Sequence, residues 1–187
     1  MRKALVFVVT LAVLAAGGAF LWSRIPVAAK QMVSTAVVCP QAAPAQVGSI
    51  TVPRGPVGGF CQAELINAAH IMNAARAQGI GVHTQAVGVM TAIGESGLRN
   101  LDHGDAAGPD SRGLFQQRAN GAWGTLADRM DPYTAATNFF NKLTSLNGWQ
   151  TMSPTEAAHA VQVNADASYY GQYWAAAQQI VAALTAN

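Results

Sequence analysis

Helical periodicity dominates residues 62–184, and it constrains the fold more than any other feature of the sequence. Apolar residues recur at three- and four-residue spacing, in segments bounded by capping residues or glycine. No segment of strand length alternates convincingly between apolar and polar residues. We therefore expect a nearly all-α, mainly helical fold, in a single compact domain over 60–187. The predicted helices cover 62–78, about 83–96, a segment that begins after Asp131-Pro132, a segment from the Ser153 capping box to about Val163, and about 167–184.

Residues 30–59 interrupt the helical pattern. They contain Pro40, Pro44, Pro53 and Pro56, with glycine and alanine between them. Because proline and glycine disfavour helices and central strands alike, we expect this segment to be a tether without regular structure.

An apolar run near the N-terminus separates Arg2 and Lys3 from Arg24. The run covers residues 4–22 without a charge, which is long for a signal-peptide core and near the minimum for a membrane-spanning helix, about 17–25 residues. Residues 1–29 are therefore interpreted as a signal peptide or a membrane anchor, and the two alternatives stay open. Both place the domain outside the cytoplasm, with the membrane as a partner if residues 4–22 are retained.

The two cysteines, Cys39 and Cys61, flank most of the proline-rich segment. In an oxidising compartment an even pair of cysteines is typical of a disulfide. Closing a loop of this size would stabilise the fold by about 3 kcal/mol. Two free thiols are the alternative.

Composition excludes several classes of function. With 51% hydrophobic and 11% charged residues, the chain is too apolar for a disordered protein. The formal net charge of +2 is too small to favour nucleic acid as a partner. His103 lies between Asp102 and Asp105, but this spacing matches no zinc or calcium motif, so no metal is expected.

Glu95 is the residue that points most clearly to chemistry. It lies at the end of the helix predicted over about 83–96, behind apolar residues. Burial and the negative end of the helix dipole both disfavour the ionised carboxylate, so its pKa is predicted to be raised. A carboxyl that stays protonated near neutral pH can act as a general acid. Gly94 and Gly97 are expected to leave room beside it for a bulky substrate.

Two short motifs accompany Glu95. The string ESGL at 95–98 is followed by a loop and then by GLFQ at 113–116. Together they resemble the ES and GLMQ signatures of lytic transglycosylases with the goose-lysozyme type of fold. The longer string, up to DPYTAATNFF, resembles an extracellular, transglycosylase-like branch of the lysozyme superfamily. The resemblance covers about residues 60–184 and implies the mainly helical architecture of that α+β superfamily.

The resemblance also implies roles for individual residues. Glu95 would be the single catalytic acid, and Ser96 would orient it or the reacting sugar. The family's Tyr-Asn motif has no literal copy, so Gln162 would replace its amide, and Tyr169 or Tyr170 would supply its tyrosine. The substrate-binding residues that follow from the resemblance are Ser96, Gly113, Leu114, Phe115, Gln116, Gln117, Gln162, Tyr169 and Tyr170.

The implied activity is cleavage of the β-1,4 bond between N-acetylmuramic acid and N-acetylglucosamine in peptidoglycan, without a cofactor. A lytic transglycosylase uses one carboxylate and leaves 1,6-anhydro-muropeptides. A hydrolytic muramidase uses a second carboxylate, for which Asp105 and Asp110 are the candidates. A non-catalytic module for wall binding or assembly is the alternative from another class. Similar enzymes open the wall for secretion or conjugation machinery, which makes such machinery a candidate partner.

Overall fold

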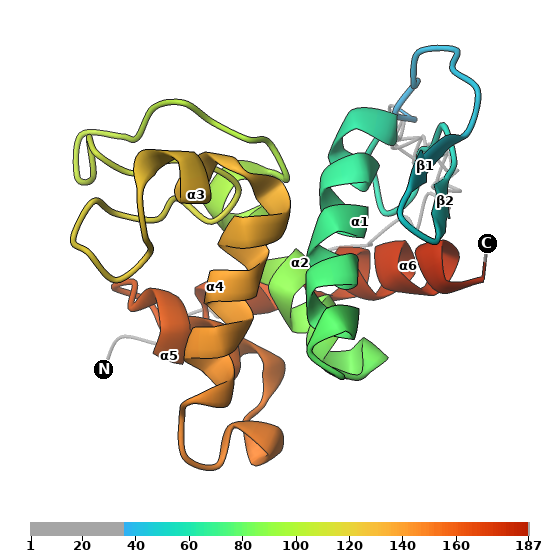
Figure 1. Ribbon diagram of the computed structural model, residues 1–187. Helices are drawn as coiled ribbons and strands as arrows, with labels where there is room; N and C mark the ends of the chain where they lie inside the picture. The colour runs from blue at the N-terminus through green and yellow to red at the C-terminus, as the bar shows by residue number, and fades with distance from the viewer. Residues whose placement is uncertain (1–35, 187) are drawn as a thin grey trace, which may run out of the picture. The chain divides into compact units, whose positions relative to one another are not determined.

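The computed structural model describes residues 36–186, and this part of the chain is mainly helical with one two-stranded sheet (Figure 1). The described residues belong to one compact unit that starts at Ala36. In chain order the elements are β1 (Ala45–Val47), β2 (Ile50–Val52), α1 (Gln62–Ala77), α2 (Val82–Ser96), α3 (Leu126–Met130), α4 (Pro132–Thr144), the 3₁₀ helix η1 (Trp149–Thr151), α5 (Pro154–Gln162), the 3₁₀ helix η2 (Tyr169–Tyr173) and α6 (Trp174–Thr185).

Helices α1, α2, α4 and α5 lie where the sequence predicts them. Asp131 caps α4 by accepting a hydrogen bond of 2.7 Å from the N–H of Thr134. Ser153 and Glu156 form the capping box of α5. The last predicted helix, over about 167–184, is instead the 3₁₀ helix η2 followed by α6. Helices α3 and η1 are not predicted, because five and three residues are too few to show a helical period.

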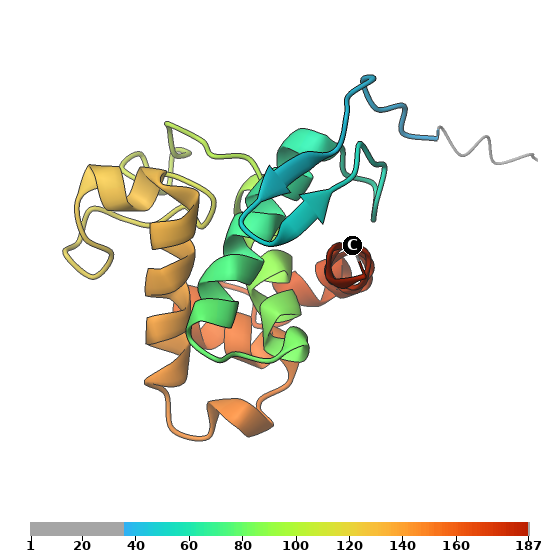
Figure 2. The same cartoon turned by 45° about the vertical axis from the view of Figure 1, so that its right-hand side comes forward.

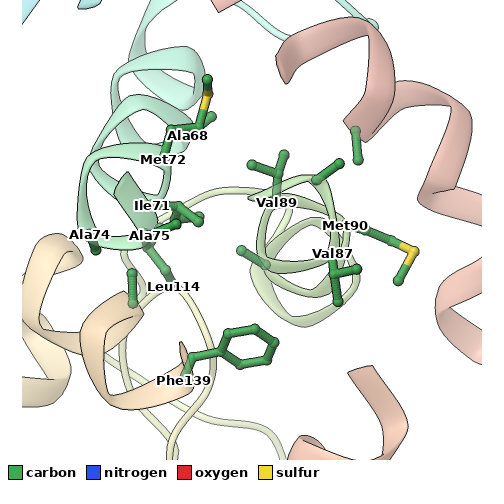
Figure 3. Packing of buried hydrophobic residues seen from close by; sticks show 14 of the residues in the cluster. Ala68, Ile71, Met72, Ala74, Ala75, Val87, Val89, Met90, Leu114 and Phe139 are labelled. Carbon is green, nitrogen blue, oxygen red and sulfur yellow. The ribbon is translucent and has the colours of Figure 1, made fainter. Parts of the chain in front are cut away.

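Helix α2 is the centre of the fold. It contacts α1, α4, α5 and α6, and every residue from Gln85 to Ile93 is buried. Gly88 permits this close packing, because a Cβ there would lie 2.5 Å from Cζ of Phe140 and 3.0 Å from Cγ2 of Ile71. Figure 3 shows side chains of α1 and α4, together with Leu114, turning toward the interior beside α2. The apolar stripe that the sequence predicts for this helix is thus one part of a wholly buried surface.

The two strands form an antiparallel hairpin that packs against α1 and α6 (Figure 2). Ile50 and Val52 are fully buried. Asn73 of α1 donates a hydrogen bond of 2.8 Å to the carbonyl oxygen of Val47. The hairpin is therefore a part of the core and of its hydrogen-bond network.

This hairpin corrects two expectations. The tether predicted over 30–59 is wrong for the residues from 36 onward, since they belong to the folded unit, which does not begin near residue 60. The nearly all-α prediction agrees with the mainly helical structure but misses this two-stranded sheet. Strands of three residues are too short for an alternating pattern to be visible in the sequence.

Cys39 and Cys61 form the predicted disulfide, with their Cα atoms 5.4 Å apart. Cys61 is also the N-cap residue of α1. The bond therefore joins the segment before the hairpin to the start of that helix. Beside it, Nε2 of Gln62 donates a hydrogen bond of 2.6 Å to the carbonyl oxygen of Ala43.

None of the helices between residues 36 and 186 is long and apolar enough to span a bilayer. The signal peptide or anchor predicted over 1–29, with its apolar run at 4–22, lies outside the described residues. Residues 30–35 of the predicted tether lie outside them as well. These parts of the interpretation stay predictions.

Replacing Ile50 by alanine tests whether the hairpin belongs to the cooperative core. Because Ile50 is fully buried, Ile50→Ala is expected to lower the free energy of unfolding by about 2–5 kcal/mol. The neighbouring Thr51→Ala is the control: Thr51 is half-buried and bonds only to Gln46 at the surface, so less than about 1 kcal/mol is expected. Urea denaturation measures both, and two equally small effects would exclude the hairpin from the core.

Candidate active site

Two cavities meet at Glu95. The first cavity has a volume of about 530 Å³ and the second about 500 Å³. Because they share part of their lining, we describe them together as the groove, with Glu95 at the junction of its two halves. The residues that line both cavities are Glu95, Asp105, Ser111, Gln116 and Asn164.

Glu95 is half-buried and occupies the next-to-last position of α2. Burial is the largest influence on this carboxyl and raises its pKa. Hydrogen bonds with Tyr170 and Gln162 lower the pKa, and the charge of Asp105 raises it, but burial prevails. The raised pKa agrees with the expectation for a carboxyl at the end of a buried helix. It keeps a proton on Glu95 at a higher pH than an ordinary glutamate would.

Tyr170 is a direct partner of Glu95. Its hydroxyl donates a short hydrogen bond to Oε1 of Glu95, and its side chain is fully buried. Burial first, and the charge of Glu95 second, raise the pKa of Tyr170, so its hydroxyl keeps its proton and remains a donor. Tyr170 therefore favours the carboxylate in a site that otherwise favours the acid.

Tyr169 supports the backbone beside Glu95. Its hydroxyl donates a hydrogen bond of 2.9 Å to the carbonyl oxygen of Gly94 and lies 3.3 Å from the hydroxyl of Tyr173. The hydrogen bond with Tyr173 raises the pKa of Tyr169 to about 12.

A Cβ on Gly94 would lie 2.8 Å from Cδ1 of Tyr170. Gly94 thus makes room for a tyrosine ring, and it also lines the first cavity, as expected of a glycine beside a binding site. Gly97 lines neither cavity and ends α2 with a φ of 63°.

Gln162, the last residue of α5, connects that helix to the second motif. Its Nε2 donates a hydrogen bond of 2.6 Å to the carbonyl oxygen of Phe115, and its side chain also bonds to Glu95. Asn164 lies two residues further on, lines both cavities and bonds to Tyr170. Asn164 is not among the predicted residues. An amide two positions past the expected place of the family's asparagine is the signal that could have found it.

Leu114 and Phe115 belong to the core. Both are fully buried, and the ring of Phe115 stacks on Phe139 of α4 with 4.8 Å between centroids. Neither residue lines either cavity. Their predicted place among the substrate-binding residues is therefore corrected: they support the groove from beneath.

Gln116 and Gln117 face the groove to different extents. Gln116 lines both cavities. Gln117 lines the second but is buried, and its Nε2 donates a hydrogen bond of 3.1 Å to the carbonyl oxygen of Ala135. Gly113 lines neither cavity and is required by close packing, since a Cβ there would lie 1.9 Å from the carbonyl oxygen of Arg129. Gln116 is thus the amide of this segment best placed to meet a ligand.

Ser96 positions the site through the backbone. Its side chain is buried, and Oγ lies 2.8 Å from the carbonyl oxygen of Leu114 and 3.1 Å from that of Ala92. Oγ also accepts a hydrogen bond from the N–H of Arg99. Ser96 lines neither cavity. The prediction placed Ser96 in contact with a ligand. In the structure it instead joins the end of α2 to the second motif.

The two candidate second carboxylates differ in their surroundings. Asp105 lines both cavities and accepts two backbone hydrogen bonds from its own turn. Asp110 lines neither cavity. It accepts a hydrogen bond from the N–H of Ala119 and pairs with Arg118, and the bond from Ala119 is the largest of the effects that lower the pKa of Asp110. Only Asp105 is placed to act on a ligand in the groove.

Backbone strain is concentrated around Glu95. Among the described residues, the non-glycine residues with positive φ are Leu98, Gln116 and Val163, at 58°, 45° and 53°. Leu98 follows α2, Gln116 lines both cavities, and Val163 lines the second. A left-handed conformation costs an ordinary residue about 1–2 kcal/mol. Strain of this kind gathers at functional sites, so its location supports a functional groove.

Within residues 36–186, no three His, Cys, Asp or Glu side chains are grouped to hold a metal ion. His103 lines the first cavity, where its Nδ1 lies 2.8 Å from Oδ1 of Asp102. The chain matches no protein-family model and no curated protein. A functional interpretation therefore depends on the geometry of the groove and on the chemistry of its residues.

Glu95→Gln tests the burial of the carboxyl through stability. Because the pKa is raised above its ordinary value of 4.5 in the folded state, the ionised carboxylate destabilises the fold at higher pH and has no effect below 4.5. Glu95→Gln is expected to unfold at a higher temperature than the wild type at neutral pH, and at the same temperature in acid. Asp110→Asn is the control. Its lowered pKa predicts the opposite sign at neutral pH, and an advantage of Glu95→Gln that grows with acidification would contradict the assignment.

Val163→Asn tests the strain at the end of α5. Val163 is 75% exposed, so the change loses little apolar burial, and asparagine tolerates the left-handed conformation. The variant is expected to be more stable by about 1 kcal/mol. Val38 is 90% exposed and has no positive φ, so Val38→Asn should change nothing. Thermal unfolding measures both, and identical effects would argue against strain at Val163.

Proposed function

We propose that the protein is a peptidoglycan-cleaving glycosidase with a lysozyme-like domain. The observation that carries the proposal is a single carboxyl, Glu95, whose pKa burial raises and which lies where two cavities join. A polymer bound along the groove would place one linkage at Glu95. The resemblance of the two motifs to lytic transglycosylases supports a glycan of the cell wall as that polymer.

The proposed reaction starts with protonated Glu95. It gives its proton to the oxygen that bridges N-acetylmuramic acid and N-acetylglucosamine, and the bond from that oxygen to C1 of the muramic sugar breaks. The carboxylate so formed accepts the hydrogen bond of Tyr170. It then takes the proton of the C6 hydroxyl, and the C6 oxygen bonds to C1. The product is a 1,6-anhydro-muropeptide, and Glu95 regains its proton.

Tyr170 and Gln162 suit the second half of this reaction. Both bond to Glu95 and lower its pKa against the effect of burial. They therefore stabilise the carboxylate just after it has lost its proton, while burial still holds the pKa of Glu95 above its ordinary value. A residue that acts first as general acid and then as general base needs such a balance. If the protonated or the ionised form were stabilised too strongly, the reaction would stop after one step.

Hydrolysis is the second candidate, and Asp105 is the observation that favours it. Asp105 is close enough for its charge to raise the pKa of Glu95 and lines both cavities. A second carboxylate could activate water or stabilise a positively charged sugar. The pairing of Asp110 with Arg118 makes it the weaker candidate.

The disulfide supports a location outside the cytoplasm, because disulfides persist in oxidising compartments. Secretion or anchoring to the membrane would bring the groove to the cell wall. No cofactor has a part in the proposed reaction.

Glu95→Gln also tests the activity. Removing a general acid is expected to slow product release from purified peptidoglycan by about 10²–10⁴-fold. Mass spectrometry of the soluble products decides the chemistry: anhydro-muropeptides indicate a transglycosylase, whereas reducing ends that are lost in Asp105→Asn indicate a muramidase. Glu64→Gln removes a carboxylate on α1 outside the groove and should act as the wild type does. If the wild type binds the wall without releasing products, the glycosidase proposal is overturned and the non-catalytic wall-binding module is favoured.

A further inference from the structure

The two halves of the groove differ in charge. Besides the shared residues, the first cavity is lined by Asp166 and His103. The second is lined by Arg118 and Lys142. A ligand that extends along the groove therefore passes from an acidic half to a basic half, with Glu95 between them.

Lys142 is the cation of the second cavity that forms no ion pair with a described residue. It lies in the last turn of α4 and is exposed, and its ammonium group has no ion-pair partner among residues 36–186. Arg118 is different, because its Nε donates to Oδ1 of Asp110. Asp105 shares the lining of this cavity, and its Oδ1 accepts hydrogen bonds from two backbone N–H groups of its own turn, but it forms no ion pair with Lys142. The second cavity thus offers the ammonium group of Lys142 to a ligand.

The remaining lining of the second cavity suits a small peptide better than a bare sugar. Trp123, Val161 and Val163 give it apolar surface, and Asn120 and Gln162 give it amides. In strands that carry their peptides the sugars are neutral, because the lactyl carboxyl of the muramic sugar is amide-linked to the peptide, and they would leave the ammonium group of Lys142 unused. A short acidic peptide carries both small apolar side chains and carboxylates, which a cation binds by charge-assisted hydrogen bonds.

We propose that the second cavity binds the acidic peptide attached to the muramic sugar, with Lys142 pairing to one of its carboxylates. This inference rests on the proposed function and narrows the substrate to glycan strands that still carry their peptides. It also orients the strand, because the sugar that bears the peptide lies toward the second cavity. Lys142 is then a specificity residue with no part in bond cleavage.

The experiment compares two substrates: intact peptidoglycan and the same peptidoglycan after its peptide carboxylates have been converted to neutral amides. Removing the peptides instead would free the lactyl carboxylates of the muramic sugars and supply new anions. The wild type is expected to release products faster from the intact form. Lys142→Gln should lower kcat/KM on the intact form about two- to fivefold, the range of a solvent-exposed ion pair, and leave the rate on the amidated form unchanged. Lys142→Glu should lower it further, and added salt should reduce the difference between wild type and variant.

Arg76→Gln is the matched control. It removes the same charge from the last turn of α1, outside both cavities, so it should change neither rate. Equal losses of Lys142→Gln on both substrates, or no loss on either, would overturn the peptide site while leaving the glycosidase in place. A wild type that cleaves neither substrate would overturn the proposed function, and this inference with it.

Discussion

The burial of α2 on all sides is the constraint on which the rest of the structure depends. A helix in this position can carry no charge along its buried length, and the first residue near its end that can ionise is Glu95. The carboxyl of Glu95 therefore lies between the hydrophobic core and the groove. Its raised pKa follows from that partly buried position. Gly88 and Gly94 contribute by letting Phe140 and Tyr170 approach the helix. The chemistry at Glu95 thus begins with the packing of the core.

Backbone carbonyl groups organise the groove around this helix end. Ser96 bonds to the carbonyl of Leu114, and Gln162 bonds to that of Phe115. Gln117 reaches the carbonyl of Ala135 on α4. These polar side chains are buried or half-buried, and each one joins two segments that are distant in sequence. The bonds hold the loop after α2 against α4 and α5, so that the two cavities open on either side of Glu95.

The sequence predicts helices, caps, the disulfide and a raised pKa for Glu95, because each depends on local pattern or on one pair of residues. The hairpin escapes prediction, since Ile50 and Val52 belong to strands of three residues. The roles near Glu95 also escape it. Leu114 and Gln116 belong to the same motif, yet one is core and the other lines the groove. Which side a residue faces depends on packing against α4, and a motif does not contain that information.

Hydrogen bonds that end on carbonyl oxygens have an evolutionary consequence. Every residue offers a carbonyl, so the acceptors at 114, 115 and 135 place no demand on the identity of their own side chains. Mutation can exchange these residues for others of similar volume while the bonds survive. Such a site can drift far in sequence and keep its shape. Similarity to distant relatives would then persist longer in the geometry around Glu95 than in the amino-acid sequence of its motifs.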